Sequence, residues 1–193
     1  LFGVPQPPQH HPEVDTGVHV CMALDQAAKR NYSLAVRFGI LTHDLGKALT
    51  PADVLPRHIG HEEAGVALAK QLTARIHTTA DIVAISQIAA AKHTHVHRAA
   101  DFRPSTLVKF LREIDALRRP HFLDQLIQIA ECDARGRTGF EDRPYPQPET
   151  LYTALAAMKA VNQGDIARSC ATKSQIPAKM YQAFISAVKG ATK

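Results

Sequence analysis

The segment LTHDLGKALTPADVLPRHIGHEEAG, residues 41–65, holds the side chains best suited to chemistry. His43 and Asp44 are adjacent at the end of an apolar run, and His58 and His61 follow within the next eighteen residues. Consecutive side chains on one helix differ in direction by about 100°, so this pair cannot chelate an ion as two histidines four residues apart do. The pair can still converge on one ion if ligands from other helices complete the shell.

Two further residues complete such a set. His19 lies twenty-four residues before His43 and faces it if their two helices pack antiparallel. Asp133 ends an otherwise apolar helix over residues 122–132, where an isolated carboxylate needs an explanation. Imidazoles and carboxylates together form a mixed nitrogen and oxygen shell that accepts several divalent metals. A metal with open positions activates water and polarises a phosphoryl oxygen, so the residues indicate phosphoester hydrolysis.

Hydrolysis of a phosphoester also requires groups that neutralise the phosphate charge. Lys47 and His61 are candidates, together with His93 and His97 of the segment KHTHVHR. Each has a structural alternative: Lys47 can neutralise a helix C-terminus and His61 can cap its helix. The alternating histidines cannot share one helical face, so we favour His93 and His97 and assign His95 to solvent.

Two arginines near Asp133 are left open by the sequence. Arg135 and Arg137 in the segment ECDARGR either bind phosphate or lie on a solvated surface.

The elements that position these side chains are all predicted to be helices. Apolar residues recur at helical spacing, and no strand alternation appears. Capping candidates are Asp15 or Thr16 for the first helix and Thr78 or Thr79 for the fourth. A proline- and glycine-containing segment, residues 136–150, is the best boundary candidate. The predicted helices cover about residues 16–28, 33–45, 61–72, 80–92, 107–114, 121–130, 149–161 and 177–190.

Composition sets the broad class. The 193 residues suffice for one core, and Cys21, Cys132 and Cys170 have no CxxC spacing, which is typical of a reducing compartment. No apolar run approaches the roughly 18 residues of a membrane span, and no signal peptide is apparent, so we expect a cytoplasmic protein without membrane contact. The opening at Leu1 and the proline-rich residues 1–14 predict a lead-in from a missing upstream domain.

Six motifs carry a family resemblance: LFGVPQ, HPEVDTGVH, HDLGK, RHIGHEEAG, STLVKF and ECDARGR, in this order. The chain resembles the C-terminal HD region of bacterial multifunctional CCA proteins, the tRNA nucleotidyltransferases, within the HD phosphohydrolase superfamily and its H…HD…D pattern. The resemblance runs from residue 1 to about residue 146. It implies an all-α fold, an HD-domain helical bundle with a small C-terminal helical extension. The implied division is a lead-in over 1–14, an HD phosphohydrolase domain over 15–140 and an extension over 141–193.

The resemblance also implies a site. His19, His43, Asp44 and Asp133 match the superfamily's metal ligands, and the cofactor is a divalent ion such as Mg, Ni, Mn or Co. The implied activities are 2′,3′-cyclic phosphodiesterase, 2′-nucleotidase and phosphatase, whereas the CCA-adding site belongs to a nucleotidyltransferase domain absent from this chain. Some relatives carry an acid directly after the position of His93, where this chain has Thr94, which puts a carboxylate-dependent step there in doubt.

The rival hypothesis is a non-catalytic module that positions tRNA or forms a homodimer. The formal charge of +5 weakly favours a polyanionic partner. A (p)ppGpp or dNTP hydrolase is disfavoured, because the opening motifs do not resemble those families. We expect nucleotide or RNA-end phosphates as substrates and tRNA as a partner. A basic stretch that is either a solvated face or an RNA backbone track comprises Arg98, Arg103, Lys109, Arg112, Arg118 and Arg119.

Overall fold

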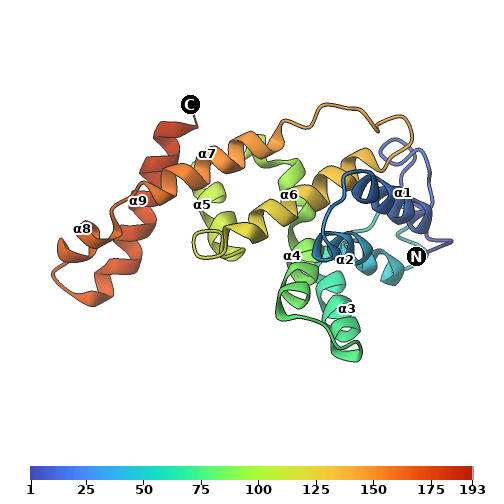
Figure 1. Ribbon diagram of the computed structural model, residues 1–193, viewed down its shortest axis with the longest axis horizontal. Coiled ribbons are helices and arrows are strands. Elements are labelled where there is room, and N and C mark those ends of the chain that lie inside the picture. The colour runs from blue at the N-terminus through green and yellow to red at the C-terminus, as the bar shows by residue number, and fades with distance from the viewer. Residues whose placement is uncertain (193) are drawn as a thin grey trace. The chain divides into compact units, whose positions relative to one another are not determined.

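The computed structural model describes residues 1–192, and its regular elements there are helices, as the sequence predicted (Figure 1). No β-strand occurs in this range, and no helix in it is long and apolar enough to cross a membrane. The α-helices are α1 (Thr16–Lys29), α2 (Leu34–Thr42), α3 (His61–Arg75), α4 (Ala80–His97), α5 (Pro104–Glu113), α6 (Pro120–Arg135), α7 (Gln147–Lys159), α8 (Gln163–Arg168) and α9 (Ile176–Ala191). Three short 3₁₀ helices are η1 (Leu45–Leu49), η2 (Ala99–Asp101) and η3 (Lys173–Gln175).

The N-terminal ends of the helices follow the capping residues. The Asp15 carboxylate accepts the Val18 N–H at 2.9 Å, and the Thr79 hydroxyl accepts the Ile82 N–H at 3.3 Å. Such side chains satisfy backbone donors that have no partner within the helix. The starts of α1 and α4 therefore lie where the sequence predicted them.

The C-terminal end of α2 differs from the prediction. The helix was expected to reach Leu45, but it ends at Thr42 and leaves His43 and Asp44 in the turn before η1. The Thr42 hydroxyl donates to the Gly39 carbonyl at 3.2 Å, and His43 Nδ1 donates to the Ile40 carbonyl at 2.6 Å. These bonds satisfy the last carbonyls of the helix, so the chain can leave it early.

The chain forms two compact units. The first comprises residues 1–96 and 124–145. Within it α1 packs against α2, which Figure 1 shows side by side, and η1 packs against α3. Its core contains fully buried aliphatic side chains from α2, α4 and α6, among them Val36, Ile40, Ile85, Ala89, Leu126 and Ile129.

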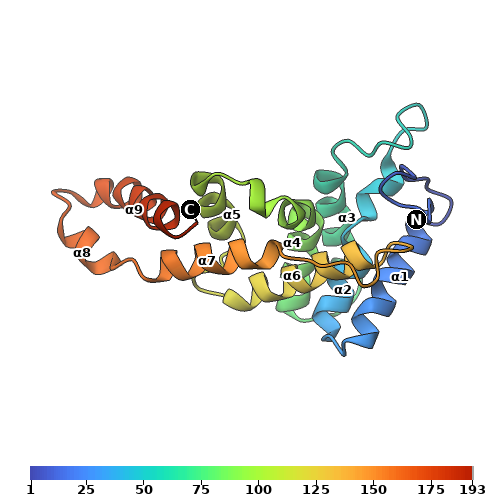
Figure 2. The same cartoon turned by 90° about the horizontal axis from the view of Figure 1, so that it is seen from above.

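The second unit comprises residues 97–123 and 146–193. Helices α5, α7 and α9 pack against one another, and Figure 2 shows α8 in the connection between α7 and α9. These units do not follow the linear division after residue 140, because α5 precedes that point and packs against the C-terminal helices. The domain boundaries inferred from the resemblance stay a prediction. The core of this unit includes Leu107, Leu111, Leu151, Met158, Phe184 and Val188.

The first fourteen residues are part of the first unit. Gln6 N–H donates to the Val14 carbonyl at 2.6 Å, and Thr16 N–H donates to the Val4 carbonyl at 3.0 Å. These bonds fold the segment back onto the start of α1. The proline-rich residues that the sequence presented as a lead-in are therefore packed against the element that carries His19.

Gly46 is expected to be essential for the packing of η1 on α3. A Cβ at this position would lie 2.6 Å from the Gly65 backbone nitrogen and closer still to the His61 carbonyl. Gly46→Ala should therefore lower the free energy of unfolding by about 1–3 kcal/mol or more, measured by urea denaturation. Gly190→Ala in α9 meets open space and should raise it by up to about 1 kcal/mol. Equal stability of the two variants would contradict the close approach.

Candidate metal centre

The four predicted metal ligands converge within the first unit. His19 comes from α1, His43 and Asp44 from the turn after α2, and Asp133 from α6. His19 Nε2 lies 3.0 Å from Asp133 Oδ1, and His43 Nε2 lies 3.2 Å from Asp44 Oδ2. One ligand atom each from His19, His43 and Asp44 lies within 4.8 Å of the others, as does one each from His43, His93 and Asp133. All of these side chains are buried.

Helix periodicity places the two distant ligands. His19 lies on the buried face of α1 with Thr16, Ala23 and Ala27. Asp133 continues the buried face of α6, and Gly136 one turn later lets the end of α6 approach α1. A Cβ on Gly136 would lie only 2.6 Å from the Ala23 nitrogen. The same close approach brings Asp133 to His19.

Backbone carbonyls orient the imidazoles around Asp44. The Nδ1 atoms of His43, His61 and His93 lie 2.6, 2.7 and 2.9 Å from the carbonyls of Ile40, His58 and Ala89, respectively. A carbonyl only accepts, so each Nδ1 carries a proton, and a ring in its neutral form presents a lone pair at Nε2. In that form each Nε2 can bind a metal ion or accept a proton.

Two of these Nε2 atoms face a carboxylate oxygen. His61 Nε2 and His93 Nε2 each lie 3.6 Å from Asp44 Oδ1. Among residues 1–192, the buried atoms His43 Nε2, His61 Nε2 and Asp44 Oδ1 have no hydrogen-bond partner. Converging acceptors repel one another unless a cation lies between them. The donor set thus fits a divalent ion, and Asp44, His61 and His93 form a further group whose ligand atoms lie within 4.8 Å of one another.

The local charges reinforce this arrangement. Burial favours a raised pKa for the Asp44 carboxyl, but the surrounding His43, Lys47 and His93 hold that pKa well below its ordinary value. Burial alone would lower the pKa of His19, but hydrogen bonds with Asp133 and Glu13 raise it to about 9. Without an ion, the positive charge of protonated His19 therefore lies beside Asp133 and Glu13, which favour a cation at this position.

The predicted phosphate-neutralising residues divide into two groups. Lys47 Nζ lies 2.7 Å from Asp44 Oδ2, and His61 and His93 face Asp44 as described. His97 belongs to none of the groups of metal-ligating atoms within residues 1–192. It is the last residue of α4, one turn and about 6 Å along the axis beyond His93.

Four residues at the site were missed or left open from the sequence. Gln6 Oε1 accepts from Lys47 Nζ, and Glu13 Oε1 lies 2.9 Å from His11 Nδ1. Gln6, His11 and Glu13 belong to residues 1–14, which show no periodicity, although HPEVDTGVH places a histidine and an acid close before His19. The fourth is Arg137, whose Nη2 donates to Asp133 Oδ1 at 3.1 Å.

Of the two arginines left open, only Arg137 contacts a predicted ligand. Burial acts to lower the pKa of its guanidinium, but Asp133 outweighs this and keeps the pKa above its ordinary value. Arg135 Nη2 instead lies 3.2 Å from Glu131 Oε1.

Comparisons with known proteins agree with this geometry. The HD domain family matches residues 16–130. The chain is similar to the "Multifunctional CCA protein" of Dechloromonas aromatica, 50% identical over 189 residues, which are 98% of this chain and 46% of that protein. The same-named protein of Burkholderia pseudomallei is 51% identical over 95% of this chain and 44% of its own length. The chain thus spans about half the length of these curated relatives. No solved structure matches it.

Metal binding is expected to stabilise the protein through the unpartnered nitrogen of His43. At a free ion concentration one hundred times the Kd, chelator-treated protein should gain about 2.7 kcal/mol, or about 5–10 °C in Tm. His43→Gln removes the ligand and should abolish most of this gain in a thermal melt with Mn²⁺ or Ni²⁺. His77→Gln, an exposed histidine outside these groups, should retain it. An equal gain in both variants would show that the ion binds elsewhere.

Proposed function

The chain belongs to the HD-domain family, and on this premise we propose that it is a metal-dependent phosphohydrolase. One observation carries the proposal: the buried atoms His43 Nε2, His61 Nε2 and Asp44 Oδ1 lie in the same cluster of metal-ligating side chains and have no hydrogen-bond partner within residues 1–192. Such a cluster of acceptors is unfavourable as a purely structural core and favourable as a ligand set. The proposal is further supported by the HD domain match, which covers residues 16–130.

In this proposal His19, His43, Asp44 and Asp133 hold a divalent ion, with Mg, Ni, Mn and Co as the candidates. When bound, the ion supplies Lewis acidity toward a phosphoryl oxygen and lowers the pKa of water. The backbone bonds at Nδ1 keep the His43 ring in its binding orientation. Asp133 is held between His19 and Arg137, so its carboxylate is fixed before any ion arrives.

The remaining residues act on the phosphate. Lys47 contacts Asp44 and Arg137 contacts Asp133, and in this proposal the two cations neutralise the phosphate charge. The His61 side chain is 11% exposed and is the more accessible of the two imidazoles facing Asp44. Its Nε2 accepts a proton from water or, once protonated, donates one to the leaving oxygen. His93 Nε2, 3.6 Å from Asp44 Oδ1, offers the ion a further nitrogen, and His97 has no part in the proposed mechanism.

The proposed substrates are 2′,3′-cyclic nucleotides, 2′-nucleotides and other phosphomonoesters at nucleotide or RNA ends. Water adds to phosphorus and one P–O bond breaks, so a cyclic diester gives a monoester and a monoester gives inorganic phosphate. These activities rest on the resemblance to CCA proteins, of which we propose this chain is the HD part. In that proposal residues 15–140 are the hydrolase domain and residues 141–193 an extension.

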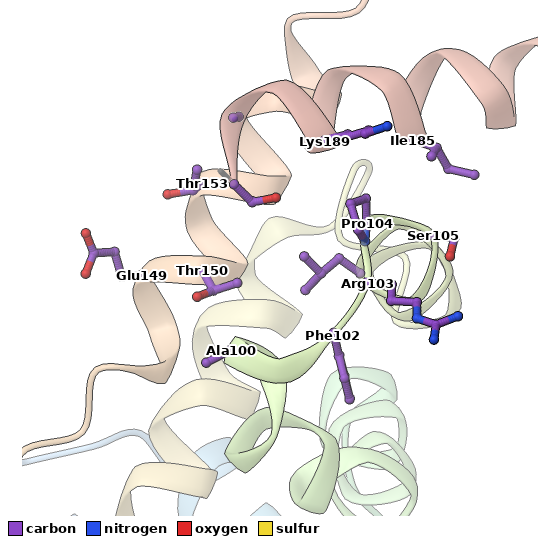
Figure 3. Close-up of a pocket in the computed structure, with 13 residues that line it drawn as sticks. Ala100, Phe102, Arg103, Pro104, Ser105, Glu149, Thr150, Thr153, Ile185 and Lys189 are labelled. Carbon is purple, nitrogen blue, oxygen red and sulfur yellow. The ribbon is translucent and has the colours of Figure 1, made fainter.

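A second proposal concerns tRNA as the partner. Counting Lys and Arg against Asp and Glu in the sequence, the second unit carries a formal charge of +7 and the first unit −2. The excess positive charge of the chain therefore lies in the unit without the metal centre. Within that unit α5, α7 and α9 line a cavity of about 710 Å³ (Figure 3). Its lining is largely apolar and includes one acid, Glu149. Arg103 and Lys189 are its cationic residues and are the groups that would bind backbone phosphates.

Removal of the Asp44 carboxylate tests the hydrolase. Asp44→Ala should reduce phosphate release from 2′-AMP and opening of 2′,3′-cyclic AMP by more than about 100-fold across a metal panel, since removal of a ligand costs at least as much as removal of an outer-shell partner. Circular dichroism checks the fold, and Asp25→Ala, at an exposed position of α1, is the matched control. Undiminished turnover in folded Asp44→Ala would reject the enzyme and favour the non-catalytic module.

The cavity of the second unit should contribute to tRNA binding. Phosphate binding releases counterions, so the double variant Arg103→Ala with Lys189→Ala should lower the slope of log K against log salt by about 0.7–0.9 for each phosphate that is no longer neutralised. Lys70→Ala with Arg75→Ala removes the same charge from exposed positions of α3 and should leave the slope unchanged. Equal slopes for both double variants would show that the cavity binds no phosphate.

A further inference from the structure

Glu13 is a buried acid outside the H…HD…D pattern, and two histidines share one of its oxygens. Its Oε1 lies 3.0 Å from His19 Nδ1 and 2.9 Å from His11 Nδ1, and its side chain is 2% exposed. Its second oxygen, Oε2, is buried and has no hydrogen-bond partner within residues 1–192. Within the described residues, this carboxylate therefore contacts the two imidazole rings through Oε1.

Two acceptors at Nδ1 determine which nitrogen of His19 carries a proton, and Glu13 is the charged one of the two. His19 Nδ1 faces two acceptors, Glu13 Oε1 and the Gly136 carbonyl at 3.2 Å, so it must be the donor. Nε2 of the same ring faces Asp133 and is the nitrogen left to bind an ion. A carboxylate on the far nitrogen fixes the tautomer and ring orientation and makes the ligating nitrogen more basic.

The atoms of His11, Glu13 and His19 also lie close enough together to resemble a separate metal site. The geometry argues against that assignment. Both Nδ1 atoms are at hydrogen-bond distance from the same oxygen, as expected for two N–H donors and not for two ligands. His11 also packs edge-on against His19, with ring centroids 4.7 Å apart, which holds the pair in place.

We propose that Glu13 is a positioning residue of the metal centre: it accepts the Nδ1 proton of His19 and thereby presents Nε2 to the ion. This inference rests on the proposed metal-binding function. It gives residues 1–14 a role in that function, because the segment that folds back onto α1 delivers the carboxylate. The Nδ1 atoms of the histidines at Asp44 face backbone carbonyls, whereas His19 Nδ1 faces the Glu13 carboxylate in addition to the Gly136 carbonyl.

The test measures Zn²⁺ and Mn²⁺ affinity by chelator competition in the whole chain. Glu13→Ala removes the charged acceptor, leaves the Gly136 carbonyl and should weaken binding about 10–100-fold. Glu13→Gln keeps an oxygen acceptor without the charge and should recover part of this affinity. Glu63→Ala, at an exposed position of α3, is the matched control and should bind as the unchanged protein does.

Nitrogen NMR of the Zn²⁺-loaded protein provides a second readout that does not depend on affinity. His19 should show a protonated Nδ1 and a ligating Nε2 in the unchanged protein, and Glu13→Ala should lose the protection of the Nδ1 proton from solvent exchange. Wild-type affinity in folded Glu13→Ala, or a His19 bound through Nδ1, would overturn the role of Glu13 alone. Failure of the unchanged protein to bind either ion would instead overturn the proposed function.

Discussion

The structure of the first unit depends on one buried carboxylate, Asp44. It lies in the turn between α2 and η1, with Lys47 beside one oxygen and the rings of His61 and His93 facing the other. A buried carboxylate is tolerated only when positive charge or donors compensate for lost water. The elements around Asp44 supply such groups or a position for an ion. The packing of α2, η1, α3 and α4 therefore also determines the chemistry of the site.

That constraint explains the early end of α2. A continued helix would direct His43 and Asp44 about 100° apart, whereas the turn lets both reach the same region. The side chains of Thr42 and His43 donate to carbonyls at the end of the helix. These bonds replace backbone hydrogen bonds that a longer helix would have made. The tight approach of η1 to α3 at Gly46 then brings His61 to Asp44.

The two units differ in charge as well as in packing. The first combines buried acids and imidazoles with a slightly negative formal charge, whereas the second is strongly basic and lines its cavity with Arg103 and Lys189. Such a separation suits a protein in which one unit carries out chemistry on a phosphate and the other holds a polyanion. The basic residues that attract the polyanion are then different from the side chains that bind the metal ion.

The sequence by itself determined the all-α class, the starts of α1 and α4 and the four residues His19, His43, Asp44 and Asp133 that converge. Those features follow from local rules, since capping and a 3.6-residue period act over one or two turns and isolated polar residues stand out on apolar helices. Tertiary structure alone decided the contribution of Glu13, the grouping of α5 with α7 and α9 and the position of His97 outside the metal-ligating groups. Each depends on contacts between residues far apart in the chain or on an irregular segment, for which no periodic pattern in the sequence specifies a direction.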